Sequence, residues 1–137
     1  MTLQAEILLD GPPVRAEAMA LTAPISFWGG VNPRTGEIAD ARHPEYGLRI
    51  AERAVLIPAT VGSSSAAAVL LELVHAQLAP AAIVLHEPDA ILLLGLIVAR
   101  EMGYATPMAV RLDARHYSNL HGKRLEISVD GRIVTNS

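Results

Sequence analysis

Apolar and polar positions alternate near both ends of the chain, which predicts β-strands there. The alternation is loose over residues 4–11 and cleaner over 14–21, with a Gly-Pro-Pro sequence between the two segments. We therefore expect two strands about a turn at the amino terminus. Near the carboxyl terminus, two alternating segments within residues 123–137 flank Asp130 and Gly131, a strong signal for a hairpin with a two-residue turn.

The middle of the chain has a different pattern, in which short continuous apolar runs alternate with longer helical periodicities. The runs at residues 53–59, 81–87 and 107–111 predict buried strands, whereas 63–77 and 88–102 predict helices. Such a β-α-β-α-β run favours parallel strands joined by right-handed crossovers. The pattern predicts an α/β fold with a mixed sheet, a central β-α-β-α-β unit and a C-terminal β-hairpin.

Residues 22–47 fit neither pattern. This segment holds seven Gly and Pro residues, too many for a helix, and is too long for an idle connection. It also carries the only Phe and the only Trp of the chain, Phe27 and Trp28, so we expect it to be packed rather than disordered. The two aromatic residues are equally suited to contact a substrate or to form the local core or a subunit interface.

Composition narrows the class of protein. The chain has 137 residues, of which 51% are hydrophobic, so one domain covering residues 1–137 is expected. A mean hydropathy of +0.33 with only 4% aromatic residues means an unusually aliphatic chain, which favours a permanent protein partner over a merely well-filled core. The net charge is −3 and the 11 Lys and Arg residues are scattered, which excludes nucleic acid and anionic membrane as expected partners.

Two further absences in the sequence bear on cofactors and location. The chain has no Cys, so thiolate ligands for an iron-sulfur cluster or a structural zinc would have to come from another chain. The longest unbroken apolar run, residues 90–99, is too short to cross a bilayer, and the first residues lack the pattern of a signal peptide. We expect a cytoplasmic protein.

Three consecutive serines, Ser63, Ser64 and Ser65, follow Gly62 where a strand is expected to lead into a helix. Ser63 or Ser64 as the N-cap is the more ordinary interpretation, because a serine oxygen satisfies unpaired amides at a helix start. One cap is enough, however. The amides and dipole at such a junction can also bind a carboxylate or phosphate and can favour a serine as base or nucleophile.

Other chemistries fit these residues less well. The pattern of a nucleophile elbow is not matched, because Val61 lies two residues before Ser63 and Ala66 stands in place of the second Gly around Ser64, which disfavours a Ser/His/Asp triad. A phosphate-binding loop would need a lysine and a second glycine. The histidines have no metal-ligand spacing, although His43 stands out by its place in the long loop.

Three segments together resemble the small, swivelling subunit of the aconitase X family. They are "PISFWGG" with the "NPRTGEIADARHPEYG" that follows, then "GSSSAAAVLLEL", then the apolar second helix, in order from about Leu21 to Pro107. The resemblance implies a swivelling β/β/α domain that closes over a separate large subunit. In this family the large subunit binds an iron or iron-sulfur centre through cysteines, which agrees with the absence of Cys here.

The resemblance also implies an activity, the dehydration of a small hydroxy acid. Bacterial members convert cis-3-hydroxy-L-proline to Δ1-pyrroline-2-carboxylate, and archaeal members act on mevalonate 5-phosphate. By similarity to aconitases, Ser63 is the base that removes the proton alpha to the carboxylate. Ser64 and Ser65 bind that carboxylate, and Gly62 permits close approach of the backbone. Val61 stands where phosphomevalonate-type members tend to carry a basic residue, so we expect the hydroxyproline substrate.

The resemblance further places part of the long loop near the cleft between the subunits. Five residues are implied to lie close to the substrate: Trp28, Gly29, Gly30, Arg34 and His43.

An alternative of another class is a mobile carrier or regulatory domain without chemistry of its own, because swivelling β/β/α domains also carry phosphohistidine in phosphotransfer enzymes. His43 or His86 would then be the acceptor, although neither has the setting of glycines and small residues that such a site needs.

Overall fold

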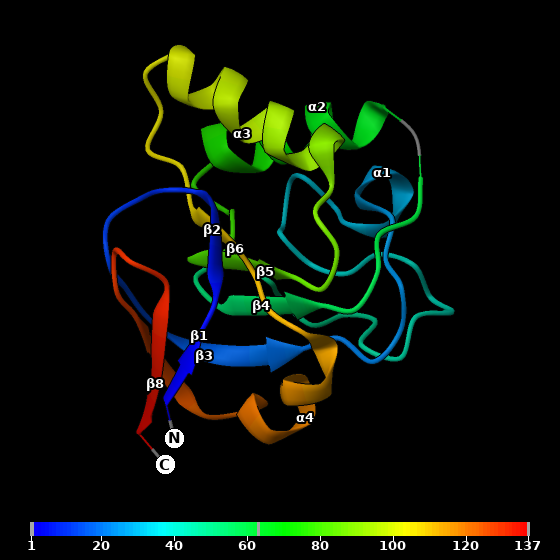
Figure 1. The fold of residues 1–137 in the computed structure, drawn as a ribbon. Coiled ribbons are helices and arrows are strands. Elements are labelled where there is room, and N and C mark those ends of the chain that lie inside the picture. Colours follow the sequence, from blue (N-terminus) through cyan, green and yellow to red (C-terminus); the bar gives the residue numbers. More distant parts are fainter. Residues whose placement is uncertain (1, 63, 137) are drawn as a thin grey trace.

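The computed structural model describes residues 2–62 and 64–136, and within them eight strands form one mixed sheet with helices packed against it (Figure 1). The strand order is β1-β8-β7-β3-β4-β5-β6-β2. The strands are β1 (Thr2–Gln4), β2 (Glu6–Leu9), β3 (Val14–Ala20), β4 (Ala54–Ile57), β5 (Ala82–Leu85), β6 (Met108–Arg111), β7 (Arg124–Ile127) and β8 (Arg132–Asn136). The helical elements are α1 (Phe27–Gly30), α2 (Ser65–His75), α3 (Ala90–Glu101), the 3-10 turn η1 (Ala114–His116) and α4 (Tyr117–Leu120).

The predicted β-α-β-α-β unit is confirmed. Strands β3, β4, β5 and β6 are parallel neighbours, and α2 and α3 connect β4 to β5 and β5 to β6. Alternate side chains of each strand enter two separate cores: in β4, Val55 and Ile57 pack with the helices, whereas Ala54 and Leu56 pack on the other face of the sheet. Burial on both faces explains why these strands are continuous apolar runs in the sequence.

Helices α2 and α3 lie side by side over one face of the sheet (Figure 1). They approach closely at Gly95, where an added Cβ would lie 2.9 Å from the carbonyl oxygen of Ala67. The outer side of α3 is apolar, and five large hydrophobic side chains on or directly after it are exposed: Ile91, Leu94, Ile97, Val98 and Met102. Among the described residues, no helix has both the length and the hydrophobicity to cross a membrane.

The amino terminus differs from the expected two strands about a turn. It forms three strands, because the pairing partner changes at the buried Ala5 and the first segment is divided into β1 and β2. β1 pairs with β8 and β2 pairs with β6, so residues 2–9 connect the two ends of the strand order. β3 follows the Gly-Pro-Pro turn but lies between β7 and β4, and its partners are therefore remote in the sequence.

The carboxyl-terminal hairpin is confirmed as an antiparallel β7–β8 pair, but four residues separate the strands instead of two. The Ser128 hydroxyl donates to the carboxylate of Asp130, and Gly131 adopts a φ of +86°. Before this hairpin, η1 and α4 form a short helical segment that the apolar pattern did not predict. The carboxylate of Asp113 opens it by accepting a 2.9 Å hydrogen bond from the Arg115 amide.

The long segment 22–47 is packed, as predicted. Ile25, Phe27, Val31 and Ile38 are at most 3% exposed and belong to the same hydrophobic cluster as α2 and α3. Its only helical element is the four-residue α1, which contains non-helical backbone at Trp28 and Gly29.

Candidate active site

The serine loop, of which residues 58–62 and 64 are described, leads from the carboxyl end of β4 to the start of α2 (Figure 1). Ser63, the predicted base, lies outside the described residues. The preceding residues are tied to the long segment: the Val61 amide donates to the Ile25 carbonyl at 2.9 Å, and the Ile25 amide donates to the Ala59 carbonyl at 3.1 Å. The backbone before the serines therefore follows a fixed path.

Gly62 has a backbone conformation that its residue type permits. Its φ of +135° is rare for side-chain-bearing residues, and an added Cβ would lie 2.6 Å from the hydroxyl oxygen of Ser26. That hydroxyl in turn donates to the Trp28 carbonyl at 2.9 Å. Ser26, which we did not single out in the sequence, thus lies directly against the turn that carries the serines.

The start of α2 is not capped in the ordinary way by Ser64. Ser64 occupies the N-cap position with helical angles, φ −59° and ψ −18°, and among the described residues its side chain makes no capping hydrogen bond. Ser64 and Ser65 are both exposed at the positive end of an eleven-residue helix. Amides and dipole at such an end favour a bound anion.

A small cavity of about 110 Å³ lies between the serine loop and the start of α3. Inside it, the Thr60 hydroxyl donates a 2.6 Å hydrogen bond to the carboxylate of Asp89. No Lys or Arg belongs to the described lining of this cavity, which consists of Phe27, Thr60, Val61, Gly62, Ala66, Asp89, Ile91 and Leu92. Sequence reasoning missed Thr60, and took Asp89 only as part of a helix start, because a contact across 29 residues leaves no local signal.

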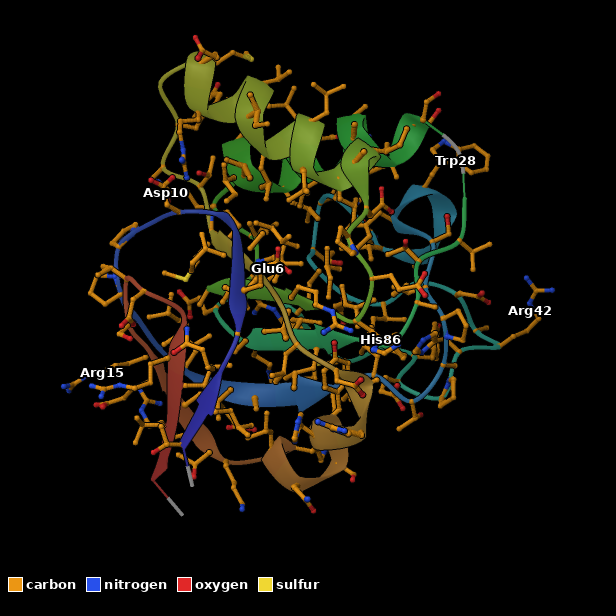
Figure 2. The ribbon with its side chains drawn as sticks, in the orientation of Figure 1. Glu6, Asp10, Arg15, Trp28, Arg42 and His86 are labelled. Carbon is orange, nitrogen blue, oxygen red and sulfur yellow. The ribbon has the colours of Figure 1, made fainter. Side chains whose placement is uncertain are left out.

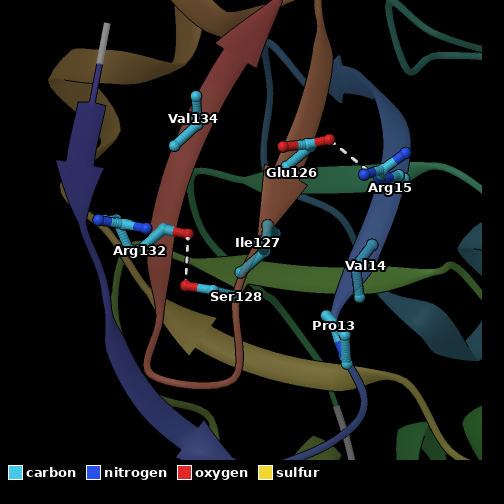
Figure 3. A pocket seen from close by; sticks show the side chains of 8 residues that line it. All are labelled: Pro13, Val14, Arg15, Glu126, Ile127, Ser128, Arg132 and Val134. Atoms are coloured by element: carbon cyan, nitrogen blue, oxygen red, sulfur yellow. Dashed lines mark hydrogen bonds and ion pairs between the residues drawn. The ribbon is translucent and has the colours of Figure 1, made fainter.

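Larger hollows lie elsewhere. One of about 480 Å³ is formed by β3, β7 and β8 (Figure 3), and it contains none of the predicted site residues. The Arg15–Glu126 ion pair at 3.0 Å borders it, and Ser128 donates to the Arg132 carbonyl at 3.2 Å. These polar groups already have partners, so size alone does not identify the functional site here.

The two aromatic side chains at the start of the long segment differ in their exposure to solvent. Phe27 is 2% exposed and belongs to the core, whereas Trp28 is 61% exposed (Figure 2). Gly29 is exposed and adopts a φ of +80°, and Gly30 is buried. The predicted contact residues of this turn therefore lie beside Ser26 and the serine loop, with Trp28 as the accessible side chain.

Arg34 and His43 form no hydrogen bond with the serine loop among the described residues. Arg34 is exposed, and its amide donates to the Asn32 side chain at 2.9 Å. The His43 side chain is only 4% exposed: Nδ1 accepts from the Glu45 amide at 3.0 Å, and Nε2 lies 3.2 Å from the Ala23 carbonyl. With both ring nitrogens occupied inside the chain, His43 holds the long segment together.

His86, the other candidate phosphate acceptor, uses Nδ1 to accept from the Ala114 amide at 2.9 Å. This contact fixes the ring between the end of β5 and the helical segment after β6.

The described residues do not form a metal centre. They contain no group of three His, Asp or Glu side chains placed to hold a metal ion, and the chain has no Cys.

Comparison with known proteins gives a consistent family. A family model of the aconitase X swivel domain matches residues 2–135. The cis-3-hydroxy-L-proline dehydratase of Pseudomonas aeruginosa is 44% identical over 113 residues, which cover 77% of this chain and 20% of that protein. The phosphomevalonate dehydratase small subunit of Methanopyrus kandleri is 37% identical over 86 residues, covering 63% and 64% of the two chains. The chain thus spans about a fifth and somewhat under two thirds of these relatives.

Among solved structures, the holo-form of aconitase X from Thermococcus kodakaraensis superposes with a TM-score of 0.85. The alignment covers 100% of this chain and 99% of that chain at 24% identity, which supports the fold. The α/β expectation, with its mixed sheet, is confirmed by this likeness.

Proposed function

The chain belongs to the aconitase X swivel domain family, and we propose that it is the small subunit of a hydro-lyase that dehydrates a small hydroxy acid. One observation of this structure carries the proposal most. The serine loop presents Ser64 and Ser65 at the exposed start of α2, and no side-chain cap from Ser64 occupies that helix end among the described residues. Such a helix start is suited to hold a substrate carboxylate.

In the proposed reaction, Ser63 removes the proton alpha to that carboxylate. The C–H bond at the alpha carbon breaks, its electrons form the double bond to the beta carbon, and the beta hydroxyl leaves. A proton alpha to a carboxylate is weakly acidic, so the step needs a positioned base and stabilisation of the developing negative charge. The α2 amides and the hydroxyls of Ser64 and Ser65 supply that stabilisation, and the helix dipole lowers the cost of a serine alkoxide.

We assign any iron centre to a larger partner chain. Bound there, it would supply a Lewis acid for the departing hydroxide. The residues of this chain bind the carboxylate, orient the alpha carbon and move its proton.

Cis-3-hydroxy-L-proline is the proposed substrate, with mevalonate 5-phosphate as the alternative. A phosphate would be expected to meet Arg or Lys. Near the serine loop, the described cavity is lined by Val61 and the Asp89 carboxylate and by no basic side chain. Arg49 lines a separate hollow with Arg15 and Arg53, where β4 begins instead of where it ends. Arg42 forms a 3.3 Å ion pair with Asp40.

The large partner is proposed to cover the exposed apolar side of α3. From Ala90 to Ala99 this helix has no charged residue, and Leu94 is 55% exposed. Ile91 borders the small cavity at the serine loop, so the apolar side is continuous with the proposed site. The Pseudomonas relative carries its matching segment as only a fifth of its length, which supports a much larger second part to cover this surface.

This partner surface can be tested by co-purification with the larger dehydratase chain of the same organism. Leu94→Lys combined with Val98→Lys should abolish co-elution, because two charges would be buried without partners. Val129→Lys is the matched control, since Val129 is 62% exposed but lies in the β7–β8 turn. Unchanged co-elution of the double variant would show that the partner binds elsewhere.

The activity itself is tested on the assembled complex with each of the two substrates. We expect turnover of cis-3-hydroxy-L-proline, no turnover of mevalonate 5-phosphate, and a loss of about 10²- to 10⁴-fold in kcat for Ser63→Ala. Ser118→Ala, at an exposed serine of α4, should leave kcat unchanged. A complex inactive on both substrates contradicts the proposed function, and a fully active Ser63→Ala contradicts the assigned base.

A further inference from the structure

A hydrogen-bonded pair joins the serine loop to the neighbouring helix. The Thr60 hydroxyl donates to Oδ2 of Asp89 at 2.6 Å. The other oxygen of the same carboxylate, Oδ1, accepts from the amides of Ile91 at 2.9 Å and Leu92 at 3.2 Å. Both oxygens of Asp89 are therefore engaged, one with the loop and one with the start of α3.

Asp89 itself is held in place by the fold. It is the N-cap of α3 with extended backbone angles, φ −120° and ψ 105°, and its carbonyl accepts from the Leu93 amide at 3.0 Å. The helix is held against α2 at Gly95. A carboxylate fixed by backbone amides is a rigid acceptor, so the hydroxyl that donates to it is fixed as well.

Thr60 is the point at which the serine loop is held from two sides. Its backbone lies in a parallel bridge with Ile25, and its side chain donates a hydrogen bond to Asp89. Gly62, two residues later, is confined by contact with Ser26. Ser63, the proposed base, follows directly in the sequence.

We infer that Thr60 and Asp89 are positioning residues for the proton transfer, a role that rests on the proposed function. In this role they hold the serine loop and do not themselves take the proton. Their hydrogen bond holds the loop that precedes the proposed base, and the role assigned to it is to keep that loop in one position during the reaction. Catalysis depends steeply on this geometry, since a displacement of about 1 Å can cost about 10²-fold in rate.

The test compares variants in the assembled complex, with cis-3-hydroxy-L-proline as the substrate. Thr60→Val removes the hydroxyl at nearly constant shape and should lower kcat about 10- to 100-fold, with KM changed by less than about threefold. Thr60→Ser keeps the hydroxyl and should restore most of kcat. Asp89→Asn keeps an acceptor for the α3 amides but alters the partner of Thr60, and the double variant should be no slower than the slower single variant.

A second readout separates positioning from a general loss of structure. With substrate carrying deuterium at the alpha carbon, the isotope effect on kcat should increase in Thr60→Val, because proton removal becomes more rate-limiting. Partial unfolding would lower the number of active sites without changing the isotope effect of those that remain. Ser128→Ala is the matched control, since it breaks a hydroxyl–carboxylate pair with Asp130 in the distant hairpin turn.

The outcomes are distinct. An active wild-type complex in which Thr60→Val leaves both kcat and the isotope effect unchanged overturns the positioning role alone. A wild-type complex inactive on the substrate overturns the proposed function and this role with it. If Thr60→Val melts at a lower temperature, Thr60→Ser and the isotope effect still decide, because neither depends on the folded fraction of that variant.

Discussion

Two neighbouring strand-to-helix junctions of this protein differ in how the first turn of the helix is capped. Both begin at a parallel strand buried over four residues, β4 or β5, and both lead into a helix of eleven or twelve residues. At the second junction, Asp89 places its own carboxylate on the first amides of α3. At the first, Ser64 makes no such contact among the described residues. The start of α3 thus carries a side-chain carboxylate, whereas the start of α2 has no side-chain cap from Ser64 among the described residues. Under the proposed function, the substrate carboxylate binds at the start of α2.

The difference also concerns how each junction is reached. The second junction is short, four residues from β5 to α3, whereas the serine loop takes seven residues from β4 to α2. The longer path allows contacts with the long segment at Ile25 and Ser26 and with Asp89. The Asp89 cap stabilises the start of α3 locally, whereas the loop before α2 is held by contacts with other segments of the chain.

Adding a side chain at Gly62, in the loop before α2, should have the largest effect on stability and on kcat. Gly62→Ala places a side chain at φ +135° and 2.6 Å from the Ser26 hydroxyl, so we expect a loss of about 1 kcal/mol or more in the free energy of unfolding. In the complex, kcat should fall about 10²-fold as the serines shift. Gly103→Ala is the control, because Gly103 has a φ of +91° but no atom within 4 Å of its added Cβ. Equal losses of activity would exclude the Ser26 contact as the cause.

Placing a carboxylate at the start of α2, as Asp89 does at the start of α3, should have the next largest effect. Ser64→Asp should raise the free energy of unfolding by about 0.3–1 kcal/mol through the α2 dipole. It should also raise the KM of an anionic substrate about tenfold, because like charges about 4 Å apart repel by about 1–4 kcal/mol. Ser64→Asn has the same shape without the charge and should change neither value much. An unchanged KM for Ser64→Asp would place the substrate carboxylate elsewhere.

Removing the Asp89 carboxylate from the start of α3 tests the comparison at the second junction. Asp89→Ala should lower the free energy of unfolding by about 1 kcal/mol, as expected for a lost N-cap, and urea denaturation measures this. Asp113→Ala provides the contrast, because Asp113 accepts one amide hydrogen bond at the start of a three-residue turn. We expect the smaller loss there, and a larger one would reverse the ranking of the two caps.

The contribution of the Asp113 cap to stability should depend on pH. The amide hydrogen bond from Arg115 lowers the pKa of Asp113, with nearby His86 and Arg115 charges acting in the same direction. Because the folded-state pKa is the lower one, this stabilisation is complete above the unfolded value of about 3.9 and is lost as the pH falls through the folded value. The difference in melting temperature between the wild type and Asp113→Asn should therefore shrink on acidification below pH about 4. A difference that grows on acidification contradicts the assignment.

The sequence predicted the parts of the fold that depend on local patterns. Runs such as 54–57 and 82–85 are continuously apolar because both faces of their strands are buried, and helical spacing marked α2 and α3. Pairing between remote strands leaves no local pattern in the sequence, which is why the break at Ala5 and the partners of β1 and β2 were missed. The short helical segment after β6 was missed because it depends on the Asp113 cap more than on apolar spacing.

In the candidate site, too, local features could be predicted from the sequence and contacts between remote segments could not. The Gly-Ser-Ser-Ser motif and its place at a strand-to-helix junction could be predicted from the sequence. The structure adds that Gly62 has a φ of +135° and no room for a Cβ beside Ser26, whereas its predicted approach to a ligand stays a prediction. The Thr60–Asp89 bond and the Ser26 contact were not readable, since each joins separate segments. His43 was selected for its place in the long loop, and its side chain lies buried between Ala23 and Glu45.

The pairing of β1 with β8 has a consequence for how such a domain can be attached to other polypeptides. Thr2 lies opposite Val134, so both ends of the fold emerge together, well away from the serine loop (Figure 1). A tether joined at either end leaves the serine loop unobstructed. The same architecture is therefore compatible with a fusion, in which one linker joins the domain to another polypeptide. It is equally compatible with a separate chain that binds its partner without a linker.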